Sequence, residues 1–295
     1  MKYKDGLILK GIGGFYTVST DDDCIYTCKA RGRFRIDRVT PIVGDRVKIQ
    51  CDDTDCSGSI LEIYPRKSEL VRPPVANIDK LLIVVSASSP KPDMLLLDKL
   101  LITCEILGII PIIILNKIDE AKTDTHEIVL EYAPAGYKIL PVSATNGTNI
   151  DLLINELENS VCCLTGQSAV GKTSIVNRIF PDLNLEVGSL SQKTYRGKHT
   201  TRNVELWKTY NGGAILDTPG FSAFEGFNIA PHELHKFYPE MRESNSCKFL
   251  DCLHINEPDC SIKHLIKANK LSFGRYERYK RLYSELLEAY KRRFD

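Results

Sequence analysis

The residues with the clearest chemistry form a loop at positions 166–173, which reads Gly-Gln-Ser-Ala-Val-Gly-Lys-Thr. Glycines near both ends let consecutive backbone N–H groups curl around a phosphate. Lys172 would bring a positive charge to the outer phosphates, and Thr173 would offer its hydroxyl to Mg²⁺. An apolar strand precedes the loop and a helix follows it, so the positive end of the helix dipole would face the anion. The loop predicts a nucleoside triphosphate site with the residues Gly166, Gln167, Ser168, Ala169, Val170, Gly171, Lys172, Thr173 and Ser174.

A second segment, Asn-Lys-Ile-Asp at 116–119, indicates which base is bound. The Asp119 carboxylate can accept hydrogen bonds from both N1–H and the exocyclic amine of guanine. Adenine has a lone pair at N1 and lacks that amine, so a desolvated carboxylate would be left unpaired. Asn116 would contact the other edge of the purine, and Lys117 would pack over the base and brace the phosphate loop. The segment therefore predicts selection of guanine.

Two further segments complete the expected nucleotide site. Ser143 and Ala144 follow a short apolar stretch, and a backbone N–H there could reach guanine O6. Asp217-Thr-Pro-Gly220 follows the apolar residues 214–216. Asp217 would reach Mg²⁺ through water, and the Gly220 N–H would sense the γ-phosphate.

The group that cleaves the phosphate is less clear from the sequence. Ras-like enzymes carry a water-orienting glutamine directly after the D-x-x-G motif, and here that position is Phe221, which cannot polarise water. The polar segment 188–201 is a candidate switch I, in which Thr200 or Thr201 would bind Mg²⁺. The sequence does not choose between the two threonines. His199 is the candidate catalytic group, with a structural or RNA-facing role as the alternative.

The order of these segments is unusual. In most GTPase domains the phosphate loop comes first, whereas here 116–119 and 143–144 precede Gly166. Because domain termini lie at the surface, often close together, rejoining them is tolerated. The order predicts a circularly permuted domain in which the switch II segment leads directly into the C-terminal region.

A cysteine- and histidine-rich segment predicts a metal site. Cys247, Cys252, His254 and Cys260 lie within 14 residues and offer three thiolates and one imidazole, a set suited to one tetrahedral Zn²⁺. Four protein ligands leave no open position, so we expect a structural metal. A second possible set remains open, consisting of Cys24, Cys28, Cys51 and Cys56.

The elements that must position these residues change in character along the chain. Residues 1–66 contain five short apolar stretches separated by turns, one of them at 33–36 and the last at 45–49. They predict a β-barrel, either an OB-fold or an SH3-like barrel. Residues 67–226 alternate buried strands with helices, including a helix at 94–107, which predicts a parallel α/β sheet. Residues 227–295 contain the predicted zinc segment and a helical tail from about 272 to 293.

Composition excludes some classes of protein. With 39 basic and 38 acidic residues the net charge is +1, so bulk positive charge would not drive nucleic-acid binding. Local basic patches do occur at 29–38 and at 263–295, where tyrosines are interleaved. They favour contacts with an RNA backbone, with solvated faces as the alternative. We expect no membrane span and a cytoplasmic location, because the longest apolar run is short and the first residues lack a signal sequence.

The whole set resembles the bacterial ribosome small-subunit-dependent GTPase A family. The resemblance rests on the shuffled nucleotide motifs, Lys-His-Thr-Thr at 198–201, Asp-Thr-Pro-Gly-Phe at 217–221 and the Cys₃His spacing. It implies an N-terminal OB-fold, a circularly permuted P-loop GTPase domain and a C-terminal zinc-binding helical domain. It also implies action late in maturation of the 30S subunit. Ala169 and Thr173 depart from the family's usual loop residues without threatening phosphate binding.

The predicted function is a GTPase that hydrolyses GTP to GDP when stimulated by the 30S subunit and couples its nucleotide state to 16S rRNA binding. The expected cofactors are GTP or GDP, Mg²⁺ and one Zn²⁺, and a monomer is expected. Two alternatives remain open: a metal-delivery GTPase, and an RNA-binding module with a structural nucleotide.

Overall fold

The computed structural model describes most of the chain. The described residues are 2–32, 34, 39–71, 74–121, 126–183, 204–217, 229–242, 247–249 and 251–292. They form two compact units. The first comprises Met1–Leu82, Ile150–Thr165 and Lys172–Phe221, and the second comprises Ile83–Asn149, Gly166–Gly171 and Ser222–Asp295.

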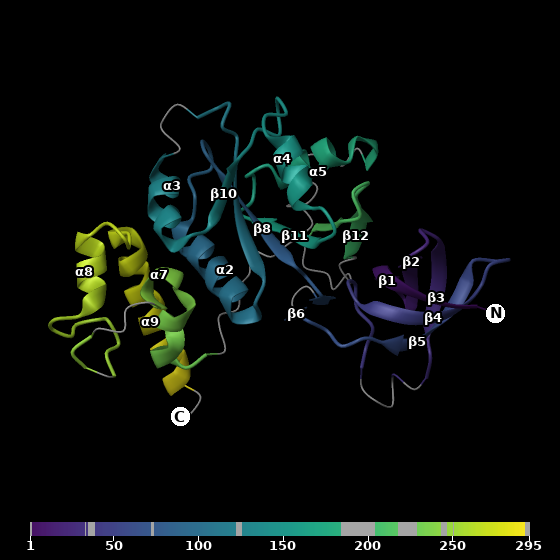
Figure 1. Cartoon of the computed structure of the whole chain (residues 1–295), viewed down its shortest axis with the longest axis horizontal. Coiled ribbons are helices and arrows are strands. Elements are labelled where there is room, and N and C mark those ends of the chain that lie inside the picture. The colour runs from purple at the N-terminus through teal and green to yellow at the C-terminus, as the bar shows by residue number, and fades with distance from the viewer. Residues whose placement is uncertain are drawn as a thin grey trace. The chain divides into compact units, whose positions relative to one another are not determined.

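In the first unit, five strands close into a barrel (Figure 1). They are β1 (Lys2–Ile12), β2 (Phe15–Thr20), β3 (Ile25–Ala30), β4 (Arg46–Asp52) and β5 (Ser57–Ile63). Strand β1 pairs with both β2 and β4, and β5 pairs with both β3 and β4, so no edge is left open. Alternate apolar residues fill the interior, where Ile8, Val18 and Ile60 are fully buried. The closed five-stranded barrel confirms the predicted OB-like fold.

One barrel strand differs from the prediction. The expected strand at 33–36 lies outside the described residues except for Phe34, which is helical and buried. The fifth strand is instead β5, which begins with the small residues Ser57, Gly58 and Ser59. These residues have no β-forming side chains and therefore give no sequence signal. A Cβ on Gly58 would lie only 2.9 Å from Cys28 Sγ, so the barrel wall requires the missing side chain.

The α/β strands carry the predicted site residues at their carboxyl ends. In the first unit, β11 (Val161–Gly166) pairs in parallel with β13 (Ala214–Asp217), and β12 (Glu205–Lys208) joins β13 in antiparallel fashion. In the second unit, β9 (Ile110–Asn116) pairs in parallel with β10 (Lys138–Pro141). Strand β8 (Lys80–Ser86) passes from the first unit into the second, where it neighbours β9. Short connecting elements are β6 (Glu69–Val71), β7 (Pro74–Ala76), α3 (His126–Tyr132), η1 (Ala133–Ala135), α4 (Ile150–Glu156), α5 (Lys172–Ile179) and η2 (Pro181–Leu183).

Helix α2 (Met94–Leu107) has the predicted bounds. The Asp93 side chain accepts a hydrogen bond from the Leu96 N–H at 3.0 Å and so caps the helix. The helix ends at Gly108, whose φ of 66° is the left-handed conformation that glycine adopts most easily. Its leucines at 97, 100 and 101 are buried, as the three- and four-residue spacing predicts.

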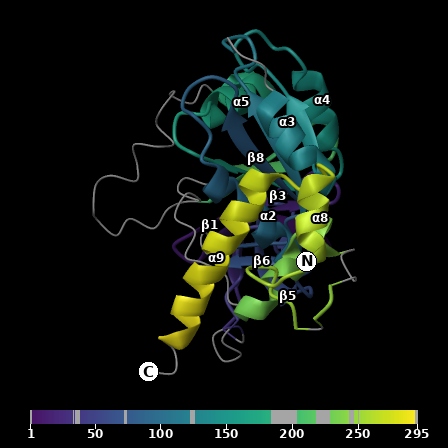
Figure 2. The same ribbon diagram turned by 90° about the vertical axis from the view of Figure 1, so that its left-hand side faces the viewer.

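The C-terminal residues form short helices and one long helix (Figure 2). They are η3 (Pro231–Phe237), α7 (Pro239–Arg242), α8 (Ser261–Lys267) and α9 (Phe273–Lys291). Leu234, Tyr238, Tyr279 and Leu282 form a shared core with the cysteines at 252 and 260. No helix in the described part of the chain combines the length and the apolar character needed to cross a bilayer.

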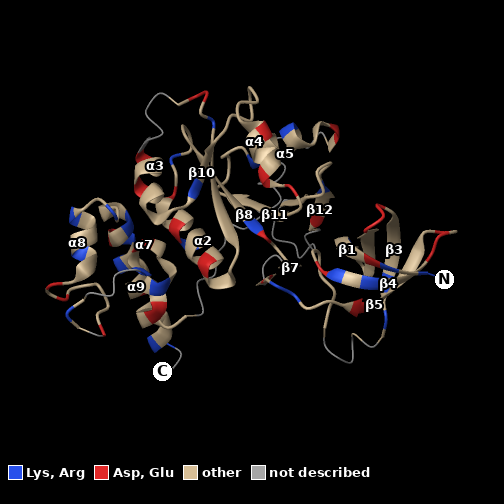
Figure 3. Cartoon of the chain, in the orientation of Figure 1, with Lys and Arg blue, Asp and Glu red and all other residues tan. Residues whose placement is uncertain are grey.

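The basic tail is only partly available to solvent. Lys and Arg side chains lie along α8 and α9 (Figure 3), yet Arg275 is 1% exposed and forms buried ion pairs. Tyr276 and Tyr279 are also buried, at 5% and 1% exposed. These two tyrosines pack inside the protein, so they are not the base-stacking rings that the sequence suggested.

Candidate nucleotide and metal sites

The predicted phosphate loop has backbone conformations that favour glycine. Gly166 has a φ of 136°, and a Cβ at that position would lie 2.2 Å from the Val84 carbonyl oxygen. Gly171 has a φ of 96°, and a Cβ there would lie 2.3 Å from Asn116 Nδ2. Ala169 also has a positive φ, of 64°. The loop curls between β11 and α5 because these positions adopt left-handed or otherwise restricted conformations.

Asn116 joins three segments that are far apart in the sequence. Its side chain is 1% exposed. Its Nδ2 donates a hydrogen bond to the Val170 carbonyl oxygen at 2.9 Å, and its Oδ1 accepts one from the Ala144 N–H at 3.1 Å. The segment at 116–119, the Ser-Ala segment and the phosphate loop therefore meet at one buried amide.

The contacts of Asn116 and Lys117 differ from the roles that the sequence suggested. Both ends of the Asn116 amide are bound to the protein, so this side chain braces the phosphate loop instead of contacting the purine. Lys117 was expected to brace the loop, but its Nζ donates to the Ser89 carbonyl oxygen at 2.6 Å. Asp119 is exposed, which leaves its carboxylate accessible to a base.

The Ser-Ala segment uses its N–H groups internally. The Ser143 N–H donates to the Thr148 carbonyl oxygen at 3.0 Å, and the Ala144 N–H is bound to Asn116. The predicted contact with guanine O6 therefore does not come from either N–H group in this conformation. These two residues instead fix the loop that holds the Asn116 amide.

Gln167 contacts a segment that sequence reasoning did not include. Its Oε1 accepts a hydrogen bond from the Asp93 N–H at 2.9 Å, and its Nε2 donates to the Lys91 carbonyl oxygen at 3.4 Å. The side chain thus ties the phosphate loop to the residues that precede α2. No sequence pattern indicates this contact, because backbone atoms supply both partners.

The remaining predicted nucleotide residues stay predictions. Lys172, Thr173 and Ser174 begin α5, and Thr173 is 6% exposed. Asp217 ends β13, where only its backbone is described. The structure describes no geometry for the other predicted switch and catalytic residues: His199, Thr200, Thr201 and Gly220 lie outside the described residues.

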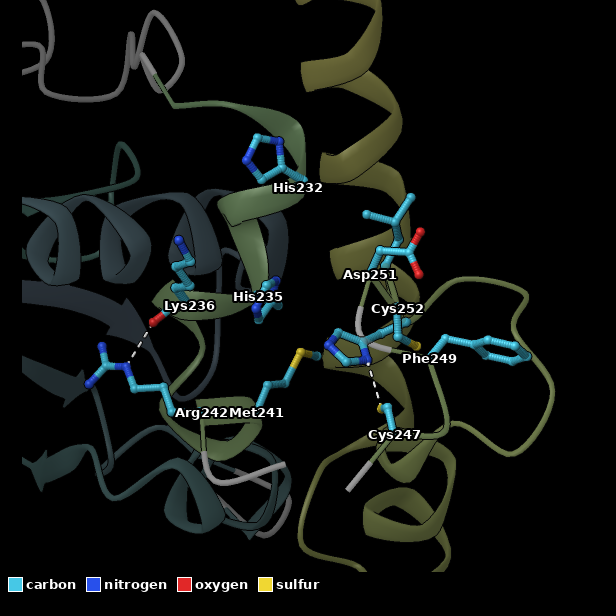
Figure 4. A pocket seen from close by; sticks show the side chains of 11 residues that line it. His232, His235, Lys236, Met241, Arg242, Cys247, Phe249, Asp251 and Cys252 are labelled. Atoms are coloured by element: carbon cyan, nitrogen blue, oxygen red, sulfur yellow. Dashed lines mark hydrogen bonds between the residues drawn. The ribbon is translucent and has the colours of Figure 1, made fainter. Parts of the chain in front are cut away.

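The four predicted metal ligands lie together in the second unit. Their ligand atoms, three Sγ and the imidazole nitrogen, are all within 4.8 Å of one another. Cys247 Sγ lies 3.6 Å from His254 Nδ1 (dashed in Figure 4) and 4.0 Å from Cys260 Sγ, and His254 Nδ1 lies 3.4 Å from Cys260 Sγ. With Zn–S bonds of about 2.3 Å and a tetrahedral angle, S···S separations should be about 3.8 Å and S···N separations about 3.6 Å. The cluster therefore has the size that a tetrahedral Zn²⁺ requires.

The protonation chemistry around the cluster also suits a metal. Burial, with a smaller contribution from the nearby His235, lowers the pKa of His254, so the imidazole is neutral and can donate a lone pair. Burial raises the pKa of Cys252 to about 12, so without a cation this thiol keeps its proton. A bound cation favours the thiolate and offsets that cost.

The surroundings of the cluster fix His254 in place. The ring of His235 meets the ring of His254 edge to face, with centroids 5.1 Å apart. A cavity of about 450 Å³ borders the cluster and is lined by residues that include His235, Arg242 and Phe249 (Figure 4). These contacts hold the imidazole within an ordered part of the C-terminal segment.

The alternative cysteine set does not form a metal site. Within the part of the chain that the structure describes, Cys247, Cys252, His254 and Cys260 are the only group of three or more potential ligands that gathers. Cys28 and Cys51 are buried in the barrel, whereas Cys24 and Cys56 are exposed. The barrel folds around an apolar core without such a cluster.

These features define a class of protein. A guanine-specificity segment follows a buried strand, a phosphate loop follows a later strand, and an asparagine joins the two. A closed β-barrel precedes this α/β region and a Cys₃His cluster follows it. The chain is a circularly permuted P-loop GTPase with flanking barrel and metal-binding segments.

Comparisons with known proteins identify the family. The family model described as RsgA GTPase matches residues 63–227, and the RsgA N-terminal domain model matches residues 5–60. The chain belongs to the RsgA GTPase family. A relative from Ruminiclostridium cellulolyticum is 46% identical over 285 residues, covering 95% of this chain and 93% of the relative. One from Caldanaerobacter subterraneus is 40% identical over 296 residues, covering 100% of this chain and 99% of the relative. Both are named small ribosomal subunit biogenesis GTPase RsgA.

Solved structures agree with this assignment. The crystal structure of YjeQ from Thermotoga maritima aligns with a TM-score of 0.85 at 31% identity, covering 97% of this chain and 99% of that one. The crystal structure of YloQ, described as a circularly permuted GTPase, aligns with a TM-score of 0.81 at 34% identity, covering 98% and 96%. The permuted fold predicted from motif order is therefore confirmed.

Proposed function

We propose that this chain is a GTP hydrolase that acts in biogenesis of the small ribosomal subunit, with turnover stimulated by the 30S particle. The observation that carries the proposal is the Asn116 amide, which joins the guanine-specificity segment to the phosphate loop. Family membership supports the same activity, because the curated relatives carry that function in their names.

The nucleotide-binding roles follow from the chemistry of the side chains. Asp119 accepts hydrogen bonds from N1–H and the exocyclic amine of guanine, and Lys172 holds the outer phosphates. Mg²⁺ binds the Thr173 hydroxyl and either Thr200 or Thr201, while Asp217 acts through water. The backbone N–H groups of the phosphate loop surround the phosphates, whereas the Gln167 side chain orients that loop from outside.

The attacking water requires an orienting group other than the residue after the D-x-x-G motif. Phe221 stands there and offers no hydrogen-bonding atom. We assign this role to His199, whose imidazole can accept a proton near neutral pH. Such an arrangement gives slow turnover by the chain alone and faster turnover when a partner orders the switch segment.

The Cys₃His cluster holds one structural Zn²⁺ through Cys247, Cys252, His254 and Cys260. The separations between the ligand atoms support a closed tetrahedral site. A metal-delivery function is not favoured, because four protein ligands leave no open coordination position for transfer.

The partners and organisation complete the proposal. The chain acts as a cytoplasmic monomer on the 30S subunit and contacts 16S rRNA. The half-exposed Phe15 on the barrel, with Lys29 Nζ 4.8 Å from its ring centroid, offers a ring and a charge suited to RNA. We assign residues 1–66 to the OB-fold RNA-binding domain, 67–226 to the GTPase domain and 227–295 to the zinc-binding and helical domain.

The test is GTP turnover by the zinc-loaded full chain with and without purified 30S subunits. We expect slow turnover alone and an increase of at least tenfold with 30S subunits, and no comparable ATP turnover. Lys172→Ala is the control and should abolish both rates, because it removes the phosphate-binding amine. Equal turnover of ATP, or a rate that 30S subunits do not change, would contradict the proposal.

A further inference from the structure

We propose that helix α2 links the phosphate-binding loop to the C-terminal helix α9, so that the nucleotide state and the Cys₃His segment influence each other through two polar contacts of this helix. One contact is made by Gln167 and the other by Asp98. The inference rests on the proposed function, because it assumes that GTP binds at the loop. It describes a second connection, separate from the covalent one through the switch II segment.

The first contact joins the phosphate loop to the start of α2. The Asp93 N–H donates to Gln167 Oε1 at 2.9 Å, and the Asp93 carboxylate accepts from the Leu96 N–H at 3.0 Å. A single residue thus binds the loop through its backbone and caps the helix through its side chain. A shift of the loop that keeps the Gln167 contact must therefore move the first turn of α2.

The second contact joins α2 to α9 one turn further along. Asp98 is fully buried, and its Oδ1 accepts from Arg275 Nη1 at 2.7 Å and from the Tyr132 hydroxyl at 3.0 Å. Its Oδ2 accepts from Arg278 Nε. Both arginines belong to α9, so one carboxylate on α2 anchors two successive turns of the C-terminal helix.

Burial makes this contact rigid. Arg275 is 1% exposed, and its Nε also donates to Glu240 Oε1 on α7 at 2.5 Å. Burial opposes the charge, yet the carboxylates of Asp98 and Glu240 hold the pKa of Arg275 well above its ordinary value. The rings of Tyr132 and Tyr238 lie 4.9 Å from the guanidinium carbon. Sliding α9 along α2 would leave these buried charges unpaired, which is strongly unfavourable.

Helix α9 then reaches the backbone of the metal-binding segment. The Tyr276 hydroxyl donates to the His254 carbonyl oxygen at 2.9 Å, and the Tyr279 hydroxyl donates to the Leu253 carbonyl oxygen at 2.7 Å. The chain of contacts therefore runs from the phosphate loop through α2 and α9 to a predicted zinc ligand. Binding of a partner to the C-terminal segment would alter nucleotide affinity by the same factor by which nucleotide alters partner affinity.

Contiguity does not by itself establish coupling, so the experiment measures coupling directly. Arg278→Gln in the zinc-loaded full chain removes one charged partner of Asp98 and leaves Arg275 in place. Arg278→Lys keeps the charge and serves as the conservative variant. Lys99→Ala is the matched control, because Lys99 pairs with Glu285 at 2.9 Å between the same two helices but at partly exposed positions, where ion pairs contribute little.

The first readout is amide hydrogen exchange of residues 273–291 with GDP and with a non-hydrolysable GTP analogue. We expect the wild-type chain to show a difference between the two nucleotides. Arg278→Gln should reduce this difference at least threefold, whereas Arg278→Lys and Lys99→Ala retain it. Nucleotide affinity and turnover without 30S subunits should stay within about twofold of wild type in all three variants.

The second readout is turnover at saturating 30S subunits, which should fall about tenfold in Arg278→Gln and recover in Arg278→Lys. Unchanged exchange differences and unchanged stimulation in Arg278→Gln would overturn the inference while leaving the proposed function intact. Loss of GTP binding or turnover in the wild-type chain would instead refute the proposed function. If Arg278→Gln fails to bind zinc or to melt cooperatively, Glu131→Gln replaces it, because Glu131 Oε1 is the other carboxylate partner of Arg278, at 2.5 Å.

Discussion

At the scale of single residues, Asn116 holds the nucleotide site together. Its amide presents a donor to the phosphate loop and an acceptor to the Ser-Ala segment, and both contacts are shielded from water. A buried hydrogen bond contributes modestly when it is made, but an unpaired buried group is costly when the partner is removed. Asn116 therefore acts on nucleotide affinity through the shape of the loop.

Asn116→Ala should lower the affinity for GDP about 10- to 100-fold, which corresponds to about 1.4 to 2.7 kcal/mol, because the Val170 carbonyl and the Ala144 N–H lose their partner. Isothermal titration calorimetry with GDP gives the measurement. Asn211→Ala is the matched control, since Asn211 Nδ2 also donates to a backbone carbonyl, that of Ile154 at 3.0 Å. An Asn116→Ala affinity within twofold of wild type would show that the amide does not shape the loop.

At the scale of elements, the C-terminal segment depends on its metal ligands more than on helix length. Helices α7 and α8 contain four and seven residues, so neither is stable by itself. Cys252 and Cys260 belong to the same core as Tyr238 and Tyr279. The ligands and the apolar side chains therefore order this segment together, and the packing of α9 depends on both.

Cys252→Ser should reduce bound zinc from about one ion per chain to less than about 0.3 and lower the melting temperature, because three ligands bind Zn²⁺ more weakly and the apo cluster loses its cross-link. Elemental analysis and thermal unfolding provide the measurements. Cys56→Ser is the control, since Cys56 is exposed on the barrel and lies outside the cluster. Full zinc occupancy in Cys252→Ser would remove that residue from the ligand set.

At the scale of the whole molecule, permutation changes the order of the segments but not their meeting point. Asn116, Ala144 and Val170 lie far apart in sequence and converge within one compact unit. Because the folded chain creates the nucleotide site and the unfolded chain lacks it, nucleotide binding must stabilise the folded state.

GDP or GTP with Mg²⁺ at 100 times its dissociation constant should stabilise the folded chain by about 2.7 kcal/mol and raise its melting temperature. ATP at the same concentration should give little or no shift, because its adenine leaves the Asp119 carboxylate unpaired. Thermal unfolding followed by circular dichroism measures both. Equal shifts with GDP and ATP would mean that the base is not recognised.

Much of the architecture was predictable because its signals are local. Helix α2 has the predicted bounds, since its apolar spacing, its Asp93 cap and the glycine at its end are all encoded within a few residues. The Cys₃His spacing likewise indicated a cluster that the structure assembles. Strand β5 was missed because Ser57, Gly58 and Ser59 fit the barrel by their small size, and small size is not a strand signal.

The sequence by itself determined the permuted GTPase class, because the residue types and motif order that define it can be read without coordinates. Only the tertiary structure decided which atom each side chain contacts. It assigned Asn116 to the phosphate loop, Gln167 to the start of α2 and Arg275 to a buried carboxylate. The physical reason is that most of these partners are backbone groups or charges distant in sequence, and only folding fixes their distance and their burial.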